Sequence, residues 1–442
     1  MAKTAEIHVS FSLLDGLQEA SQEQLTALAA ELPRDIWFTT PLTGPGEAPR
    51  PDFTWTLRGS YPYEDTIATG TAHVYLATDG RRRIQRPLIF ADGFNYGPSD
   101  LDGLWTFFDK QEGGRFLTSL REAGHDVILL GFDERHTYIQ ANAGVATACI
   151  ERAIAEREGD QKLVVGGVSM GGTITRYALA RMQHNGDDPQ TRTYFSWDTP
   201  HLGAWIPLIL QQMAHFFEDY TDEAPGEPKQ AELLRSPAAQ QLLWAWVENS
   251  KYQGPVATAS PLRTQFLKDL AAVGNFPTDM ARVGVANGHG AGTGLKLTPG
   301  EIAFEYKKEY NVASATARIQ PDLGDKQPIG GMHIALAVRR SSTTSVPALD
   351  GAPGGTLASF GLVAKKLGIE VDPRFDYTCF VPSVSATALH HDPLHWEDVD
   401  FFTDLSAPDS GPFDLDAFRC ADDNSPHSEP RPELTEWLIN HI

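Results

Sequence analysis

Cysteine, basic residues and an apolar leader are scarce in this 442-residue sequence, and each shortage excludes a class of protein. The three cysteines, Cys149, Cys379 and Cys420, are odd in number and widely spaced, so they indicate neither a disulfide framework nor a Cys-x-x-Cys metal site. The 36 Lys and Arg residues face 58 Asp and Glu, and the net charge of −22 disfavours nucleic acid and anionic membranes as partners. Residues 1–12 hold one lysine and no long apolar run, so we expect a cytoplasmic protein without a signal peptide or membrane span.

Hydrophobic residues, by contrast, are plentiful. They make up 41% of the sequence and aromatic residues make up 10%, which is typical of a folded globular protein rather than a disordered one. A single hydrophobic core stops growing at about 250–300 residues. We therefore expect one globular core with sizeable additions.

Short apolar runs alternate with amphipathic segments in a rhythm that predicts the fold class. Strand-like alternation over residues 52–78 predicts antiparallel strands at the start. Buried strands are then expected at residues 87–90, 126–130, 163–165, 193–197 and 281–286, with helices at 140–157 and 174–183. Parallel strands joined by helices are buried on both faces and read as continuous apolar runs. The sequence therefore predicts a doubly wound, mostly parallel α/β sheet.

Two long segments interrupt this rhythm. Residues 205–276 are mainly helical in pattern and richer in apolar side chains than a connector needs, so we interpret them as a helical lid, with an ordinary helical subdomain as the alternative. Residues 296–348 indicate a β-hairpin insertion. The predicted division is an N-terminal β extension at 1–84, which includes a helix at 18–32, a core formed by 85–204, 277–295 and 349–442, the lid, and the insertion.

The clearest chemical signal is a Gly-x-Ser-x-Gly pattern formed by Gly167, Ser169 and Gly171. It follows an apolar strand and precedes a helix-forming segment, which is the context of a nucleophile elbow. Glycine on both sides lets the strand turn sharply into the helix and leaves the serine hydroxyl exposed to a substrate. The pattern predicts Ser169 as a nucleophile.

A serine nucleophile needs two N–H donors for the oxyanion of the tetrahedral intermediate. In the elbow arrangement one donor is the backbone N–H of the residue after the serine, which is Met170. The other comes from the loop after an earlier strand, and Asp92-Gly93-Phe94 occupies that place. We predict Phe94 as the second donor; a plain glycine turn is the alternative.

These residues resemble a known family. The Thr-Pro-His-Leu-Gly run at 199–203 is similar to the Thr-Pro-His-x-Gly segment of bacterial lipases and esterases in the α/β-hydrolase superfamily, and residues 167–177 resemble the nucleophile helix of the same group. The resemblance covers roughly residues 87–207 and resumes near the C-terminus. It implies an α/β-hydrolase fold that cleaves esters, with amides as a further option.

The base of a triad must follow Ser169, because the chain order in this fold is serine, acid, histidine. His427 lies in a polar loop directly before a predicted helix at 433–439, where the catalytic histidine of the resembled family falls. His390, His391 and His395 compete for the role of base or of a metal site. Exposed loop histidines are the simpler interpretation, and no metal is predicted.

The acid is expected between the seventh core strand and His427. Asp350 begins a glycine-rich turn at 350–355, where a carboxylate could orient the imidazole. We predict Asp350 as the acid, with a solvated turn aspartate as the alternative and with Asp392 and Asp322 in reserve.

Together these predictions describe a serine hydrolase that cleaves a carboxylic ester through an acyl-enzyme on Ser169. The expected partner is a small-molecule ester with an apolar acyl part, and no cofactor is required. One alternative keeps the triad but acts as an acyltransferase, a macrocyclising thioesterase or an amide hydrolase. A remote alternative is a catalytically dead binding module, because fold alone does not fix function.

Overall fold

A computed structural model describes residues 42–110, 114–220, 230–322, 324–344, 346–392, 394–395, 397–407 and 411–442, together with Ala27 and Leu32. The helix predicted at 18–32 lies outside the described residues, apart from those two positions. No helix in the described ranges is long and apolar enough to cross a membrane.

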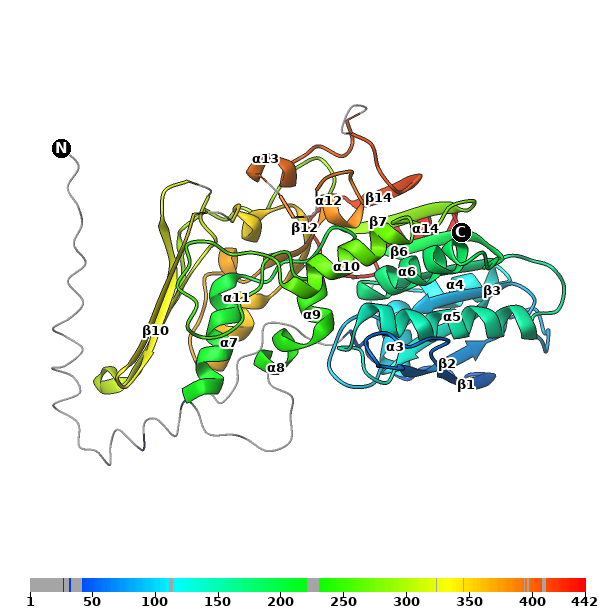
Figure 1. Ribbon diagram of the computed structural model, residues 1–442, viewed down its shortest axis with the longest axis horizontal. Coiled ribbons are helices and arrows are strands. Elements are labelled where there is room, and N and C mark those ends of the chain that lie inside the picture. Colours follow the sequence, from blue (N-terminus) through cyan, green and yellow to red (C-terminus); the bar gives the residue numbers. More distant parts are fainter. Residues whose placement is uncertain are drawn as a thin grey trace.

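An eight-stranded sheet forms the centre of the main body (Figure 1). Its strands are β1 (Phe53–Arg58), β2 (Thr69–Tyr75), β3 (Pro87–Ala91), β4 (Asp126–Phe132), β5 (Leu163–Val168), β6 (Thr191–Trp197), β7 (Ala281–His289) and β14 (Ala417–Ala421). They follow the order β1-β2-β4-β3-β5-β6-β7-β14. The β1–β2 and β2–β4 pairs are antiparallel and all other pairs are parallel. This order confirms the predicted α/β-hydrolase fold.

Successive side chains of each buried strand point to opposite faces of the sheet, so each strand contributes apolar side chains to both faces. In β3, Leu88 and Phe90 pack beneath the helices of one face, whereas Ile89 and Ala91 pack beneath those of the other. The first face carries α3 (Leu101–Lys110), α4 (Phe116–Glu122) and α14 (Pro432–Ile439). The second carries α5 (Ile139–Glu156) and α6 (Met170–His184). Burial on both faces explains why these strands read as continuous apolar runs.

The sequence prediction differs from the structure at several elements. Helix α6 begins at Met170, directly after the serine, rather than at residue 174. Strand β13 (Thr378–Pro382) stands apart from the main sheet and pairs with β12 (Gly354–Leu357) in a separate two-stranded sheet. Helices α3 and α4 and the last core strand, β14, were not predicted. In β14 only two of the five residues are buried, so its apolar pattern is weak.

The β-rich insertion is confirmed as a second, antiparallel sheet in the order β11-β10-β9-β8. Its strands are β8 (Ile302–Lys307), β9 (Ala313–Arg318), β10 (Gln327–Ile334) and β11 (Ala337–Thr343). Figure 1 shows it at the opposite end of the molecule from the main sheet, with α7 (Leu208–Tyr220) against β10. Three further short helices are α11 (Ser359–Lys366), α12 (Ser383–Ala386), which packs against β7 of the main sheet, and α13 (Asp398–Phe401).

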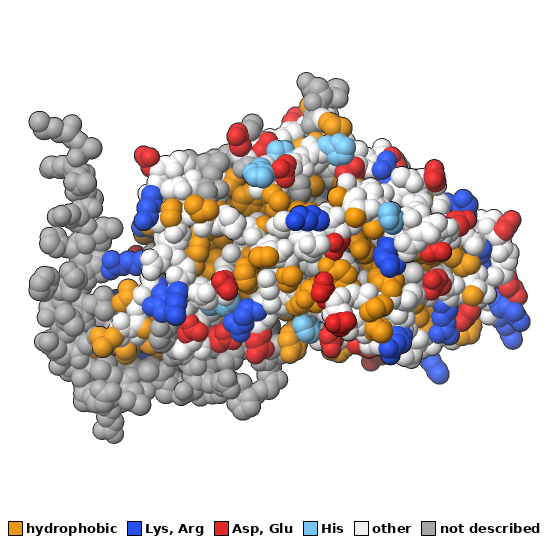
Figure 2. All heavy atoms as spheres, in the orientation of Figure 1, with side chains coloured by type: hydrophobic (Ala, Val, Ile, Leu, Met, Phe, Trp, Pro, Cys, Tyr) orange, Lys and Arg blue, Asp and Glu red, His pale blue; other side chains and the backbone are white. Residues whose placement is uncertain are grey.

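The helical segment continues with α8 (Gln230–Arg235), α9 (Pro237–Leu242) and α10 (Pro261–Ala272). Buried Arg263 of α10 donates from Nη1 to the carbonyl of Gln241, 2.9 Å away, and from Nη2 to the carbonyl of Leu202. The Gln241 side chain accepts the N–H of Ile139 at 2.9 Å. Helix α9 is thereby tied to the core at its C-terminal end. In the space-filling view, hydrophobic side chains gather over the middle of the molecule, between its two ends (Figure 2).

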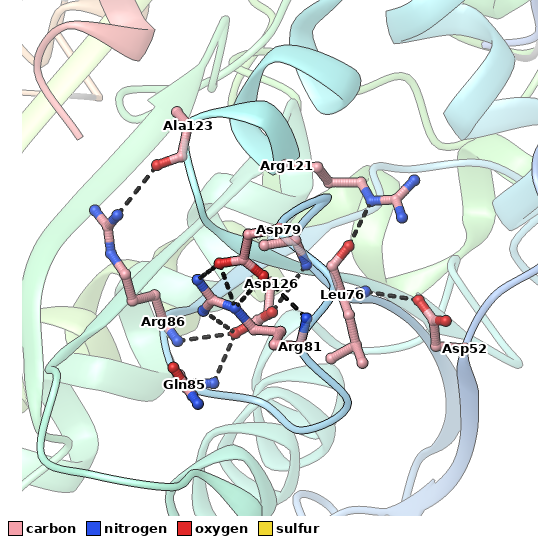
Figure 3. A network of polar contacts seen from close by, with 10 residues as sticks. Asp52, Leu76, Asp79, Arg81, Gln85, Arg86, Arg121, Ala123 and Asp126 are labelled. Atoms are coloured by element: carbon pink, nitrogen blue, oxygen red, sulfur yellow. Dashed lines mark hydrogen bonds and ion pairs between the residues drawn. The ribbon is translucent and has the colours of Figure 1, made fainter.

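A buried carboxylate fixes the start of β4 (Figure 3). Asp126 accepts the N–H groups of Ala77, Gln85 and Arg86 at 3.0, 2.7 and 2.8 Å. Its Oδ2 also lies 3.4 Å from Arg81, whose guanidinium pairs with the exposed Asp79. One side chain thus satisfies three backbone donors at the turn that leads into β3.

Replacing Asp126 by alanine should lower the free energy of unfolding by on the order of 3 kcal/mol, because it leaves those buried N–H donors without an acceptor. Urea denaturation followed by circular dichroism measures this. Asp79→Asn is the matched control, since it touches the same arginine from an exposed position and should hardly move the midpoint. Equal midpoints for the two variants would contradict this role for Asp126.

Candidate active site

Ser169 occupies a sharp turn between β5 and α6. Its backbone has φ 52° and ψ −127°, a strained conformation for a residue with a side chain, of the kind that clusters at functional sites. Glycine makes the turn possible, because a Cβ on Gly171 would lie 2.3 Å from the carbonyl oxygen of Ala91. The strand, turn and helix have the geometry of a nucleophile elbow.

The side chain of His427 lies beside that of Ser169. Its Nε2 lies 2.9 Å from Ser169 Oγ, and its Nδ1 lies 2.6 Å from Oδ2 of Asp198. A carboxylate can only accept, so Nδ1 carries the proton and Nε2 is left as an acceptor for the serine hydroxyl. Both side chains are buried, with 6% exposure for Ser169 and 8% for His427. The three residues form a continuous hydrogen-bonded chain.

Asp198 is held from several directions. It follows β6 with φ 46°, in the left-handed region that aspartate tolerates better than most residues. Its Oδ1 accepts the backbone N–H of Asn287 at 3.0 Å, and Oδ2 accepts that of Ser428 at 3.3 Å. The Asn287 side chain in turn donates to Oγ of Ser425 at 2.9 Å. A single residue of β7 therefore fixes both the carboxylate and the loop that carries the histidine.

The prediction that Asp350 orients His427 is wrong. Asp350 is fully buried, where Oδ1 accepts Trp205 Nε1–H at 2.7 Å and Oδ2 accepts the N–H of Gln320 at 2.6 Å. Burial raises its pKa to about 6, against the lowering effect of those two hydrogen bonds. Asp350 thus joins the loop after β6 to the insertion and does not reach the imidazole. The reserve candidates, Asp392 and Asp322, do not reach it either, because Nδ1 of His427 is on Asp198.

The sequence contained a usable signal for Asp198. Strands β5 and β6 are parallel neighbours in which Val168 pairs with Trp197. Ser169 and Asp198 are the next residues on the two strands, and carboxyl ends of parallel strands meet at one edge of a sheet. An aspartate at the end of the strand beside the nucleophile was therefore the stronger candidate. Because a single stretch of sequence does not reveal which strands are neighbours, the prediction instead placed the acid beyond the seventh strand.

The competing histidines lie elsewhere. His390 pairs with Asp414 at 2.8 Å, and His395 pairs with Asp392 at 2.7 Å. His391 lies 3.4 Å from Asp400. Within the described ranges, no group of three or more His, Cys, Asp or Glu side chains is placed to hold a metal ion.

The loop predicted to supply an oxyanion donor passes directly over the serine. A Cβ on Gly93 would lie 3.1 Å from Ser169 Cβ, so the loop comes closer than most side chains would allow. Asp92 and Arg135 pair at 3.3 Å beneath it, and Arg135 also donates to the carbonyl of Tyr96 at 3.0 Å. These contacts hold the backbone of Phe94 in place. The N–H groups of Phe94 and Met170 remain the two proposed donors to the oxyanion.

A cavity of about 300 Å³ opens above Ser169 and His427. A smaller apolar slot of about 40 Å³ continues from it. The slot is closed mainly by α8 and α9. Five residues line both the cavity and the slot: Phe94, Ala204, Leu233, Leu242 and Phe380. The rest of the slot is lined by Ile206, Gln230, Leu234, Ala239 and Leu243. The helical segment therefore forms one wall of the cavity.

No protein-family model matches the chain, and no curated protein matches it significantly in sequence. Among solved structures, the mature lipase BlEst2 of Bacillus licheniformis is similar over 53% of this chain and 72% of its own, with 15% identity and a TM-score of 0.28. Esterase Est22 is similar over 53% of this chain and 63% of its own, with 12% identity and a TM-score of 0.31. Brefeldin A esterase, a bacterial homologue of human hormone-sensitive lipase, is similar over 64% of this chain and 72% of its own, with 14% identity and a TM-score of 0.29. Likenesses this partial carry no argument, so the fold assignment rests on the strand order of this chain.

Gly355 faces the Asp198 carboxylate, and a Cβ there would lie 2.1 Å from Oδ2. Gly355→Ala should therefore push the carboxylate away from His427 Nδ1. The expected result is loss of the downfield imidazole N–H proton signal in NMR spectra, because that signal depends on a short hydrogen bond to a carboxylate. Gly351→Ala in the same turn is the control, since its Cβ would meet nothing closer than 3.7 Å. A signal unchanged in Gly355→Ala would contradict this steric argument.

Proposed function

We propose that this protein is a serine hydrolase that cleaves carboxylic esters through an acyl-enzyme on Ser169. The observation that carries the proposal is the hydrogen-bonded chain from Asp198 through His427 to Ser169 at the wall of a cavity. A serine hydroxyl is a weak nucleophile until an adjacent base accepts its proton, and the base works only in the correct tautomer. The hydrogen bonds to Asp198 and Ser169 fit that requirement.

The reaction follows from these positions. Ser169 Oγ attacks the acyl carbon while its proton moves to His427 Nε2, and Asp198 stabilises the imidazolium. The bond from the acyl carbon to the alcohol oxygen breaks as His427 returns the proton to that oxygen. Water then attacks the acyl-enzyme while losing a proton to His427, and the bond from the acyl carbon to Ser169 Oγ breaks as His427 returns that proton to the serine oxygen, which releases the acid and restores the enzyme. The Met170 and Phe94 N–H groups are proposed to bind the oxyanion in both halves.

The apolar slot is proposed to bind the acyl chain. It begins beside Phe94, on the oxyanion side of Ser169, and its walls are apolar apart from Gln230. The predicted lid then acts as a fixed wall, because Arg263 and Gln241 tie α9 to the core. Burial lowers the pKa of Arg263 to about 10, still well above neutrality, so this guanidinium stays charged at working pH.

The catalytic proposal is tested with three variants. Ser169→Ala should abolish turnover of p-nitrophenyl esters and labelling by a fluorophosphonate, because it removes the nucleophile. Asp198→Asn should lower kcat by about 10⁴-fold, because an amide can hold the imidazole in the wrong tautomer. Asp350→Asn should keep the kcat of the folded enzyme, and a loss as large as that of Asp198→Asn would overturn the revised triad.

Asp350→Asn should also change how stability depends on pH. Because burial raises the pKa of Asp350 from 3.8 to about 6, the native state binds more protons than the unfolded state between these values. Its contribution to stability is therefore present at about pH 4 and is lost as the pH rises to about 6. Thermal melts across this range should show that decline in the wild type relative to Asp350→Asn. Parallel curves would exclude it.

Acyl-chain selection is tested at Ala239, which lines the slot but not the main cavity. Each buried methylene contributes about 0.8 kcal/mol, so kcat/KM should rise about fourfold per carbon from acetate until the slot is full. Ala239→Leu should fill part of the slot and move the maximum to shorter chains. A profile from acetate to laurate that is flat, or unchanged by the substitution, would remove the acyl-slot assignment and leave the triad untouched.

A further inference from the structure

Glu429 is a charged side chain of the cavity above Ser169 that belongs neither to the triad nor to the apolar slot. Glu429 lines the cavity and stands two residues beyond His427 on the same loop. Its backbone is fixed, because its carbonyl accepts Asn287 Nδ2–H at 2.8 Å and its N–H donates to the carbonyl of Pro426 at 3.1 Å. The side chain is 31% exposed. A carboxylate is therefore held beside the proton-transferring histidine.

The charge of Glu429 is only partly balanced. Its Oε2 lies 3.7 Å from Arg431, and that oxygen is buried without a hydrogen bond. The same guanidinium also lies 3.4 Å from Asp423 and 3.4 Å from Glu433. Three carboxylates thus share one cation. Burial raises the pKa of Glu429, and the Arg431 charge opposes that rise and favours the carboxylate form. A negative potential remains at this wall of the cavity.

The other charges of the cavity do not cancel it. Asp92 and Arg135 also line the cavity and form a pair of their own at 3.3 Å. The cavity is also lined by four aromatic side chains, Phe94, Phe107, Tyr377 and Phe380. The Phe380 ring lies 4.8 Å from the His427 ring between centroids, and aromatic faces attract cations. The wall near the 427–429 loop is therefore suited to a positively charged group.

We propose that Glu429 selects esters whose alcohol part carries a positive charge. This rests on the proposed function, because His427 must hand its proton to the alcohol oxygen, which places the alcohol beside the 427–429 loop while the acyl chain occupies the slot. The substrate class is then an ester with an apolar acyl chain and a cationic alcohol. The net charge of −22 would also steer such a molecule toward the protein.

The experiment compares butyrylcholine with its uncharged isostere, 3,3-dimethylbutyl butyrate, using acid release in a pH-stat. The kcat/KM ratio of the charged to the neutral ester should be about tenfold in the wild type, because one partly screened charge separates the two substrates. Glu429→Gln keeps the shape of the side chain and should bring the ratio close to one. The ratio is insensitive to a general loss of active enzyme.

Glu433→Gln is the matched control. It removes a carboxylate from the same arginine, but from α14 and outside the cavity lining, so the ratio should stay near its wild-type value. A wild-type ratio near one, or a ratio that Glu429→Gln leaves unchanged while a fluorophosphonate labels Ser169, would overturn this proposal alone. Absence of both labelling and turnover would overturn the proposed function with it.

Discussion

The parallel pairing of β5 with β6 is the constraint on which the site depends. It sets Val168 beside Trp197, so the two residues that follow leave the sheet side by side. Both Ser169 and Asp198 then take positive φ angles of 52° and 46°. Strain of this kind persists only where the surroundings over-determine it. Here the N–H of Ser169 donates to the carbonyl of Trp197 at 2.8 Å, so the two strand ends are also joined directly.

His427 is brought to this edge by a different route. Its loop follows β14, two strands away from β6 in the sheet, and β7 lies between them. Asn287 of β7 bridges the gap, with its backbone N–H on Asp198 and its side chain on Ser425. The Asn287 Oδ1 in turn accepts Trp197 Nε1–H at 3.1 Å, which orients the amide. Asn287 thus positions both Asp198 and the loop that carries His427, so the two side chains do not depend on two independent loops.

Local patterns explain why some of the site was predictable and some was not. Ser169 could be predicted as a nucleophile because its motif requires only strand, glycine, turn and helix in succession, and all of these are short-range features. The choice of His427 depended on its place before the last helix, which is also local. The acid depends on which strands are neighbours, and strand order is not encoded in a single stretch of sequence. Asp350 was attractive because its turn is glycine-rich, yet one glycine of that turn, Gly355, makes room for Asp198 instead.

The additions to the sheet show the same division between local and long-range information. Their existence was predictable from apolar content and hairpin spacing, because each is a property of one segment. Their arrangement was not, since α9 is held by Arg263, 22 residues from Gln241, and by the start of α5, where Ile139 is 102 residues from Gln241. A buried guanidinium that binds main-chain carbonyls is costly to desolvate and is tolerated only when its donors are used. That cost argues for a wall of fixed shape over the serine. Selectivity would then come from what the wall and the 427–429 loop present to a substrate, and not from the opening and closing of a cover.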